Sequence, residues 1–149
     1  MTSRLSSVRL AAALAIAAGF TAVAHADDAT ALSAASKEPG AVVTASGLVF
    51  KSLKEGTGAS PAATDVVKVN YAGTMTDGKK FDASADHGGP IEFPLNRVIP
   101  CWTEGVQKMK VGGKATLVCP SDLAYGDQGR PGIPGGATLT FEIELLAIQ

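Results

Sequence analysis

Few residues of this 149-residue chain have the types and spacing that catalysis normally requires. Ser84 and His87 lie close together on an apparent loop, and chance placement explains this better than a nucleophile–base pair. The two histidines and two cysteines are too few and too scattered for a structural zinc site. Carboxylates paired in a distinctive setting are also missing. The sequence therefore gives little support to a hydrolase or a redox enzyme, and we expect neither a metal ion nor a cofactor.

The most distinctive segment surrounds the only tryptophan of the chain. Trp102, Val106 and Met109 are spaced at i, i+4 and i+7, which places them on one face of a helix of about two turns. Pro100 suits the first helical position, where its missing N–H costs nothing. The pair 112–113, both glycine, is expected to stop the helix and turn the chain. Trp102 is then either an ordinary core anchor or the floor of a pocket.

Alternating apolar and polar residues predict strands around this helix. The last strand is the clearest, because apolar residues from Leu139 to Leu145 alternate with polar ones. Asp77-Gly78 predicts a hairpin turn. The predicted strands span residues 48–53, 66–74, 91–93, 115–119 and 138–145. The expected fold class is α+β, with an antiparallel sheet of about five strands curled around one short amphipathic helix.

A long loop rich in glycine and proline separates the last two predicted strands. It runs from 125 to 137 and shows neither a strand nor a helix pattern. Loops of this length in a small domain are often functional. No Gly-Lys-Ser/Thr sequence carries a strand into a helix here, so a phosphate-binding loop is excluded. We expect a lid over a neighbouring pocket.

The N-terminus has the pattern of a cleavable secretory signal. Arg4 and Arg9 precede an apolar run over residues 10–24, which ends in Ala24-His25-Ala26. A basic head, a short apolar stretch and an A-x-A end are typical of such signals, whereas a membrane-spanning helix needs about twenty apolar residues. We therefore expect residues 1–26 to be removed and the mature protein to be periplasmic or secreted.

The mature chain is expected to contain one domain, over residues 47–149, after a flexible linker over residues 27–46 that is rich in Ala, Ser and Thr. Removal of the signal takes away Arg4 and Arg9, which leaves 11 basic and 14 acidic residues and a net charge of −3. No basic stripe is present, so neither nucleic acid nor an anionic membrane is an expected partner.

The two cysteines favour a disulfide if the protein is exported. Cys101 lies at the start of the predicted helix and Cys119 at the end of the following strand. A bridge between them would close a loop of about 19 residues and stabilise the fold by roughly 3 kcal/mol. Two buried free thiols are the alternative.

Several motifs of the domain occur together in a recognisable order: Tyr71, Phe81-Asp82, Val98-Ile99-Pro100-x-Trp102, Ala124-Tyr125-Gly126 and Phe141. In their order and spacing, residues 47–149 resemble the FKBP-type peptidyl-prolyl cis–trans isomerases, the macrolide-binding immunophilins. The resemblance implies isomerisation of X–Pro bonds in exported polypeptides during folding, and binding of macrolide inhibitors. Some exported members of that family carry a long helical dimerisation region; this chain lacks one, so we expect a monomer.

The resemblance also implies roles for individual residues. Trp102 forms the floor of a proline slot, and Asp82 sits at the rim facing the twisting amide. The backbone N–H of Ile99 and the hydroxyl of Tyr125 hold substrate carbonyls. Ile133, in the loop, covers the proline ring. The expected walls of the slot are Tyr71, Phe81, Val98, Ile99 and Phe141.

Prolyl isomerisation suits a chain without an activated nucleophile. Rotation of a peptide bond has a barrier of about 18–20 kcal/mol because resonance gives the C–N bond double-bond character. X–Pro bonds populate both isomers and exchange over roughly 10–100 s. The planar amide is charge-separated, whereas the twisted transition state has lost that resonance. An apolar, water-poor pocket therefore penalises the ground state more than the transition state.

Three positions depart from the better-known cytosolic members of the family. Ile91 stands where those members tend to have an aromatic wall residue, and His87 and Arg130 replace the expected rim residues. Macrolide affinity and the preference for the residue before proline are therefore expected to differ.

Two other classes of function compete with an isomerase. The first is a proline-peptide-binding module or chaperone whose isomerase activity is incidental. The second is a hydrolytic enzyme on a small α+β scaffold, against which the missing nucleophile–base and metal motifs argue. Asp82 and Tyr125 beside Trp102 favour turnover over binding alone.

Overall fold

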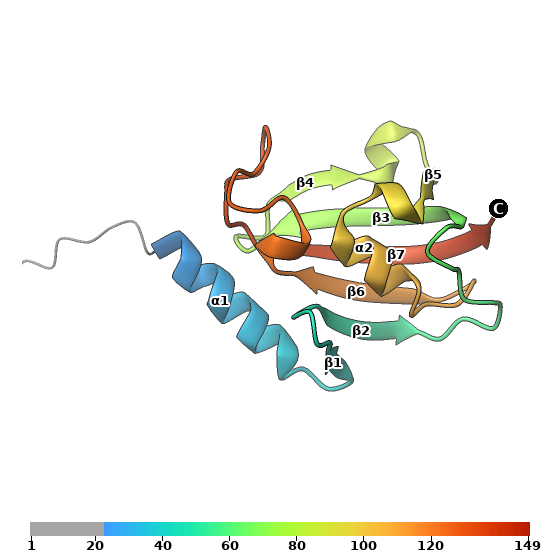
Figure 1. The fold of residues 1–149 in the computed structure, drawn as a ribbon, viewed down its shortest axis with the longest axis horizontal. Helices are drawn as coiled ribbons and strands as arrows, with labels where there is room; N and C mark the ends of the chain where they lie inside the picture. Colours follow the sequence, from blue (N-terminus) through green and yellow to red (C-terminus); the bar gives the residue numbers. More distant parts are fainter. Residues whose placement is uncertain (1–22) are drawn as a thin grey trace, which may run out of the picture.

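Seven strands form one antiparallel sheet in the computed structural model, which describes residues 23–149 (Figure 1). The order across the sheet is β1-β2-β6-β7-β3-β4, and β5 also pairs with β3. The strands are β1 (Ala41–Val43), β2 (Val49–Lys54), β3 (Val66–Met75), β4 (Lys80–Ala83), β5 (Ile91–Pro94), β6 (Lys114–Cys119) and β7 (Leu139–Ile148).

The α+β class is confirmed, but the expected number of about five strands was wrong. Strand β3 is ten residues long, and its outer edge holds two short strands. Residues 72–74 pair with β4, and residues 66–69 pair with β5. The two strands missing from the expectation are β1, which has three residues and no alternation, and the four-residue β4, which follows the hairpin turn expected at Asp77-Gly78.

Helix α2 (Pro100–Val106) lies across one face of the sheet and closes the core. Trp102, Val106 and Met109 are 4%, 0% and 4% exposed, so the predicted buried face is confirmed. The helix nevertheless ends at Val106, before Met109. The N–H groups of Lys108 and Met109 donate to carbonyls three residues back, which tightens the last turn and ends the α-helix.

The segment expected to be a linker contains two ordered elements, β1 and most of helix α1 (Val23–Ser36). Val118 points away from α2, because its neighbours in β6 face the core. It is only 6% exposed, and together with Ala31 and Ala34 it lines a cavity of about 200 Å³. The N–H of Thr138 donates to the Asp28 carboxylate at 3.0 Å. Helix α1 therefore packs on the sheet face opposite α2.

The predicted signal over residues 1–26 lies almost entirely outside the described residues, and only its last four residues fall in the first turn of α1. Neither helix in residues 23–149 combines the length and apolar character needed to cross a bilayer.

A disulfide joins α2 to the sheet, as predicted. It links Cys101, in the first turn of α2, to Cys119, the last residue of β6, with Cα atoms 5.8 Å apart. Both residues are fully buried. The bridge therefore holds the helix that carries Trp102 against the strand that it crosses.

Replacing both cysteines with alanine is expected to lower the free energy of unfolding by roughly 3 kcal/mol, because the unfolded chain regains the entropy that the closed loop removes. Urea denaturation of Cys101→Ala/Cys119→Ala measures this loss, and the reduced parent protein should match the variant. Two alkylatable thiols in the native protein would contradict the bridge.

Gly105→Ala is expected to destabilise the protein by about 1–3 kcal/mol, although alanine is the better helix former. A β-carbon at Gly105 would lie 2.2 Å from Cδ2 of Leu117, a fully buried residue of β6. Thermal denaturation measures the effect. Lys108→Ala, at an exposed position just beyond α2, is the control and should change stability by no more than about 0.5 kcal/mol. A stabilised Gly105→Ala protein would show that α2 is not held this closely to β6.

Candidate active site

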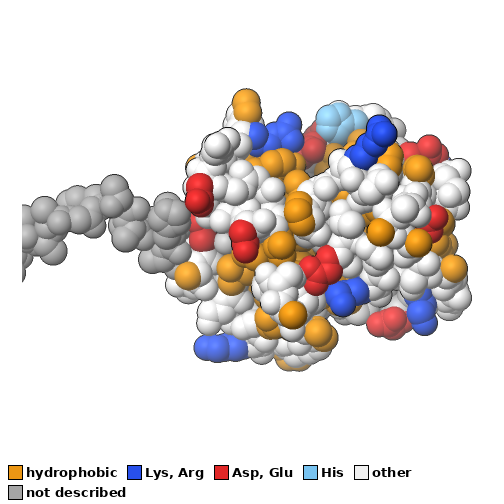
Figure 2. Space-filling model, in the orientation of Figure 1, with side chains coloured by type: hydrophobic (Ala, Val, Ile, Leu, Met, Phe, Trp, Pro, Cys, Tyr) orange, Lys and Arg blue, Asp and Glu red, His pale blue; other side chains and the backbone are white. Residues whose placement is uncertain are grey.

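A pocket of about 320 Å³ opens beside α2. This size is at the lower end of the range found for small-ligand pockets, roughly 300–1,000 Å³. On the face seen in Figure 2, hydrophobic atoms are exposed near the upper edge, between basic side chains and a histidine. The pocket is lined by Tyr71, Phe81, Asp82, Phe93, Arg97, Val98, Ile99, Trp102, Tyr125, Arg130 and Phe141.

Trp102 forms the aromatic floor of this pocket. Three rings meet it edge to face, with centroid distances of 5.1 Å to Tyr71, 5.4 Å to Phe93 and 5.4 Å to Phe141. Such contacts stabilise by about 0.5–1.5 kcal/mol each beyond the area that they bury. The indole Nε1–H is buried and has no hydrogen-bond partner among the described residues. The floor is therefore a buried, closely packed aromatic surface.

Gly73 makes room for the aromatic wall. A β-carbon at this position would lie 2.5 Å from Cζ of Phe81 and 2.9 Å from Cε1 of Phe141. Gly73 pairs with Asp82 on one side and with Phe141 on the other. The missing side chain lets the two phenylalanine rings meet over β3, with centroids 5.5 Å apart.

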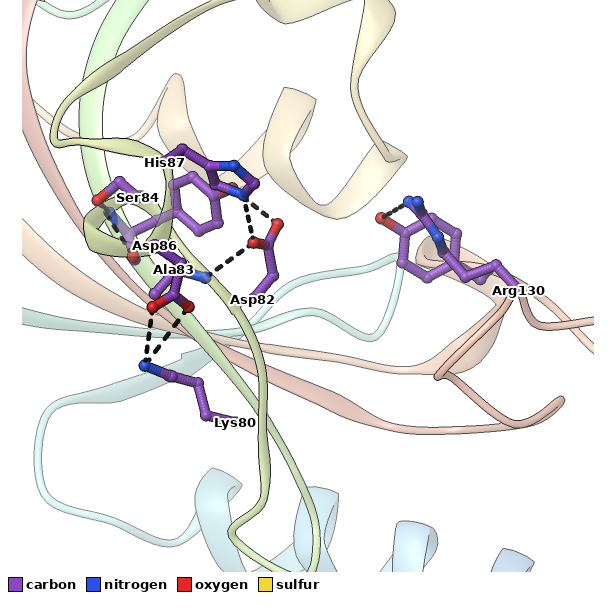
Figure 3. A network of polar contacts seen from close by, with 9 residues as sticks. Lys80, Asp82, Ala83, Ser84, Asp86, His87 and Arg130 are labelled. Atoms are coloured by element: carbon purple, nitrogen blue, oxygen red, sulfur yellow. Dashed lines mark hydrogen bonds and ion pairs between the residues drawn. The ribbon is translucent and has the colours of Figure 1, made fainter.

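Asp82 is held in place by hydrogen bonds to both carboxylate oxygens (Figure 3). Oδ2 accepts the hydroxyl of Tyr71 at 2.7 Å. Oδ1 accepts the N–H of Ala83 at 2.9 Å and lies 2.8 Å from Nε2 of His87. The carboxylate is therefore fixed at the mouth of the pocket, between Tyr71 of β3 and the short 3-10 helix η1 (Ser84–His87).

The same contacts keep Asp82 ionised. Partial burial acts to raise the pKa of the Asp82 carboxyl, but hydrogen bonds from Tyr71, His87 and the Ala83 N–H, with the nearby His87 charge, outweigh it and hold the pKa below its ordinary value. Burial, followed by the bond to the Asp82 carboxylate, raises the pKa of the Tyr71 hydroxyl. Tyr71 therefore remains a donor and Asp82 remains an anion at neutral pH.

Tyr125 and Arg130 form the opposite wall of the pocket. Nη1 of Arg130 donates to the Tyr125 hydroxyl at 3.2 Å, and its guanidinium lies 5.1 Å from the centroid of the Tyr125 ring. A tyrosine hydroxyl has one proton and two lone pairs. Because its oxygen accepts from Arg130, its own O–H is free to donate to a ligand in the pocket.

Ile99 offers a backbone donor at the pocket. It is the N-cap of α2, and its carbonyl accepts from the N–H groups of Trp102 and Thr103. Within residues 23–149, its own N–H donates to no protein group. A pocket ligand with a carbonyl oxygen can therefore be held by the Ile99 N–H.

Eight of the nine residues expected from the sequence to bind or turn over substrate line this pocket. Ile133 is the exception. It is 6% exposed, packs in the core, and exchanges two backbone hydrogen bonds with Arg130, at 2.8 and 2.9 Å. Its side chain anchors the loop in the core, whereas Tyr125 and Arg130 are the loop residues that line the pocket.

The sequence reasoning missed two lining residues, Phe93 and Arg97. Phe93 shares one face of β5 with Ile91, since the exposed Glu92 lies between them, and this pattern could have predicted a second aromatic ring beside Tyr71. The ring centroids of Tyr71 and Phe93 are 5.9 Å apart. Ile91 itself does not line the pocket. No pattern in the sequence indicates Arg97.

Comparison with known protein families assigns this fold and pocket to one family. Residues 58–146 match a model of the FKBP-type peptidyl-prolyl cis-trans isomerases. The chain belongs to the FKBP family. The resemblance inferred from the motifs is thereby confirmed.

The FKBP relatives include proteins named FkpA. The one from Aeromonas hydrophila is 57% identical over 118 residues, which cover 79% of this chain and 44% of the relative. The one from Escherichia coli K12 is 49% identical over 113 residues, which cover 76% of this chain and 42% of the relative. The chain thus matches less than half the length of these curated relatives.

Solved FKBP structures share the fold. The crystal structure of FkpA from Escherichia coli has a TM-score of 0.83 and 44% identity, and covers 85% of this chain and 59% of that one. A peptidyl-prolyl cis-trans isomerase from Pseudomonas syringae has a TM-score of 0.81 and 38% identity, and covers 89% of this chain and 98% of that one. This confirms the α+β architecture across nearly all described residues.

Asp82→Asn is expected to change how stability depends on acid pH. Since the folded pKa of Asp82 is lowered, the unfolded state binds more protons between the folded pKa and the unfolded value, about 3.9. The stabilisation from Asp82 is complete above the unfolded pKa and is lost as the pH falls through the folded one. The parent should therefore lose stability on acidification with a steeper slope than Asp82→Asn.

Urea denaturation between about pH 2 and 6 measures these slopes. Asp122→Asn, which removes an exposed carboxylate far along the chain in η3 (Ser121–Leu123), is the matched control and should follow the parent. Coincident slopes for the parent and Asp82→Asn would show that the Tyr71–Asp82–His87 contacts do not stabilise the ionised carboxylate.

Proposed function

We propose that this chain is a peptidyl-prolyl cis–trans isomerase that accelerates X–Pro isomerisation during the folding of exported polypeptides. One observation carries the proposal: the buried Trp102 forms the floor of an aromatic pocket large enough for a pyrrolidine ring. Membership of the FKBP family supports the same activity. The chain matches less than half the length of the curated FkpA relatives, so the activity is argued here from its own pocket.

The proposed mechanism forms no covalent intermediate. The proline ring enters the slot above Trp102, and the aromatic walls exclude water from the X–Pro bond. Two donors hold substrate carbonyls, namely the backbone N–H of Ile99 and the hydroxyl of Tyr125. These contacts orient the peptide, while the dry surroundings disfavour the charge-separated planar amide more than the twisted transition state.

Asp82 contributes a fixed negative charge. In the planar amide, resonance places partial negative charge on the carbonyl oxygen, and this charge decreases as the bond twists. A carboxylate close to that oxygen therefore destabilises the planar state more than the twisted one. The bonds from Tyr71 and His87 hold Asp82 in this role, since a mobile carboxylate would turn towards solvent.

The N-terminal pattern and the disulfide support export to a periplasm or beyond the cell. A cleavable signal implies translocation, and a buried disulfide persists in an oxidising compartment. We further propose that the domain acts as a monomer and that macrolide inhibitors compete with proline peptides for the pocket. Size-exclusion chromatography tests the first point and inhibitor titration tests the second.

Pocket variants are expected to lose isomerase activity. Trp102→Leu removes the floor and Asp82→Ala removes the fixed charge, and each should lower kcat/KM for short X–Pro peptides by about tenfold or more, equivalent to about 1.4 kcal/mol of transition-state stabilisation. A coupled or exchange-based peptide assay measures the rate. Asp122→Ala, at an exposed site, is the control and should keep the parent rate.

Tyr125→Phe is a second test, because Trp102→Leu also disturbs the core and can lose activity through misfolding. Tyr125→Phe removes only one hydroxyl at a half-buried site. It should lower kcat/KM several-fold and leave the melting temperature near that of the parent. Unchanged rates in folded Asp82→Ala and Tyr125→Phe would remove both residues from the mechanism. A chaperone activity that persists in all pocket variants, without turnover in the parent, would favour a binding module instead.

A further inference from the structure

Two arginines lie at the mouth of the pocket, and they come from different elements. Arg97 ends the 3-10 helix η2 (Leu95–Arg97), and Arg130 belongs to the loop between η3 and β7. Both are exposed, and both line the pocket whose floor is Trp102. We call Arg97 and Arg130 the arginine rim.

Neither guanidinium of the arginine rim has an acidic partner in the described part of the chain. Asp82 is the one carboxylate that lines the pocket, and both of its oxygens are occupied by other donors. Figure 3 shows Arg130 apart from Asp82, on the far side of the site. The ion pairs in residues 23–149 are Lys51–Glu38, Lys80–Asp86, His87–Asp82 and Lys114–Glu142.

Arg130 is already positioned to receive an anion. Its guanidinium rests against the Tyr125 ring and donates to the Tyr125 hydroxyl through Nη1. A guanidinium has five N–H donors, so most of them remain free. The backbone of Arg130 is fixed by its two hydrogen bonds with Ile133. These contacts orient the guanidinium, which reduces the conformational entropy that it loses when a carboxylate binds.

The charge at the mouth is opposite in sign to that of the whole chain. The full sequence has a net charge of −1, whereas the lining residues include two arginines and one aspartate. Apolar aromatic walls surround these charges, and such walls strengthen the field inside a cleft. The mouth therefore attracts anionic groups, although the molecule as a whole does not.

We propose that the arginine rim selects proline segments that carry a glutamate or aspartate next to the proline. A planar carboxylate matches the donor geometry of a guanidinium, and the arginines flank the slot that takes the proline ring. This inference rests on the proposed function only in placing proline in the slot. One exposed contact of this kind changes affinity by about two- to fivefold.

Matched peptides test the proposal. The acetylated, amidated peptides Ala-Glu-Pro-Ala, Ala-Gln-Pro-Ala and Ala-Ala-Pro-Glu differ only in the position and presence of one carboxylate. Trp102 is the only tryptophan of the chain, so its fluorescence reports binding whether or not turnover occurs. Exchange NMR on the same peptides measures isomerisation separately. A glutamate peptide should bind about two- to fivefold more tightly than the glutamine peptide, and less so as salt is raised.

The variants Arg97→Gln, Arg130→Gln and the double variant should bring the glutamate-to-glutamine affinity ratio towards one. Lys108→Gln removes the same charge at an exposed site outside the pocket and should keep the parent ratio. A ratio of one in the parent, or a parent-like ratio in the double variant, overturns the proposal. A glutamate preference without accelerated exchange of any peptide supports the arginine rim and refutes the isomerase, whereas normal exchange with a ratio of one does the opposite.

Discussion

The edge-to-face packing of aromatic rings on Trp102 is the contact on which the rest of the structure depends. Tyr71, Phe93 and Phe141 come from three strands and meet the indole at centroid distances of 5.1–5.4 Å. The cluster completes the hydrophobic core and is also the floor of the pocket. A substitution that loosens it is therefore expected to affect both the stability and the site.

Close approach of the elements makes this packing feasible. Gly73 leaves space for Phe81 and Phe141 above β3, and Gly105 lets α2 press on Leu117 of β6. The disulfide between Cys101 and Cys119 adds a covalent link at the same crossing. Helix α2 is only seven residues long, so it gains little from its own backbone and is held by these tertiary contacts.

The charged side chains that line the pocket lie at its rim, where the aromatic floor meets solvent. The Asp82 carboxylate accepts hydrogen bonds from Tyr71, Ala83 and His87, so its negative charge is held in position. Arg97 and Arg130 have no carboxylate partner in residues 23–149. The rim therefore combines one satisfied anion with two available cations. In the proposed function, Asp82 acts on the X–Pro amide, whereas the two arginines bind the residue beside the proline.

The sequence alone determined the family, the α+β class, the disulfide partners and most of the pocket. These depend on local signals: the spacing of Trp102, Val106 and Met109, the alternation in β7, and motif residues such as Asp82 and Tyr125. The tertiary structure decided what depends on contacts between distant segments. Helix α1 packs against strand residues far along the chain, and Arg97 reaches the pocket only because η2 turns beside it. Ile133 lies in the hydrophobic core for the same reason, because it packs there against residues from other elements.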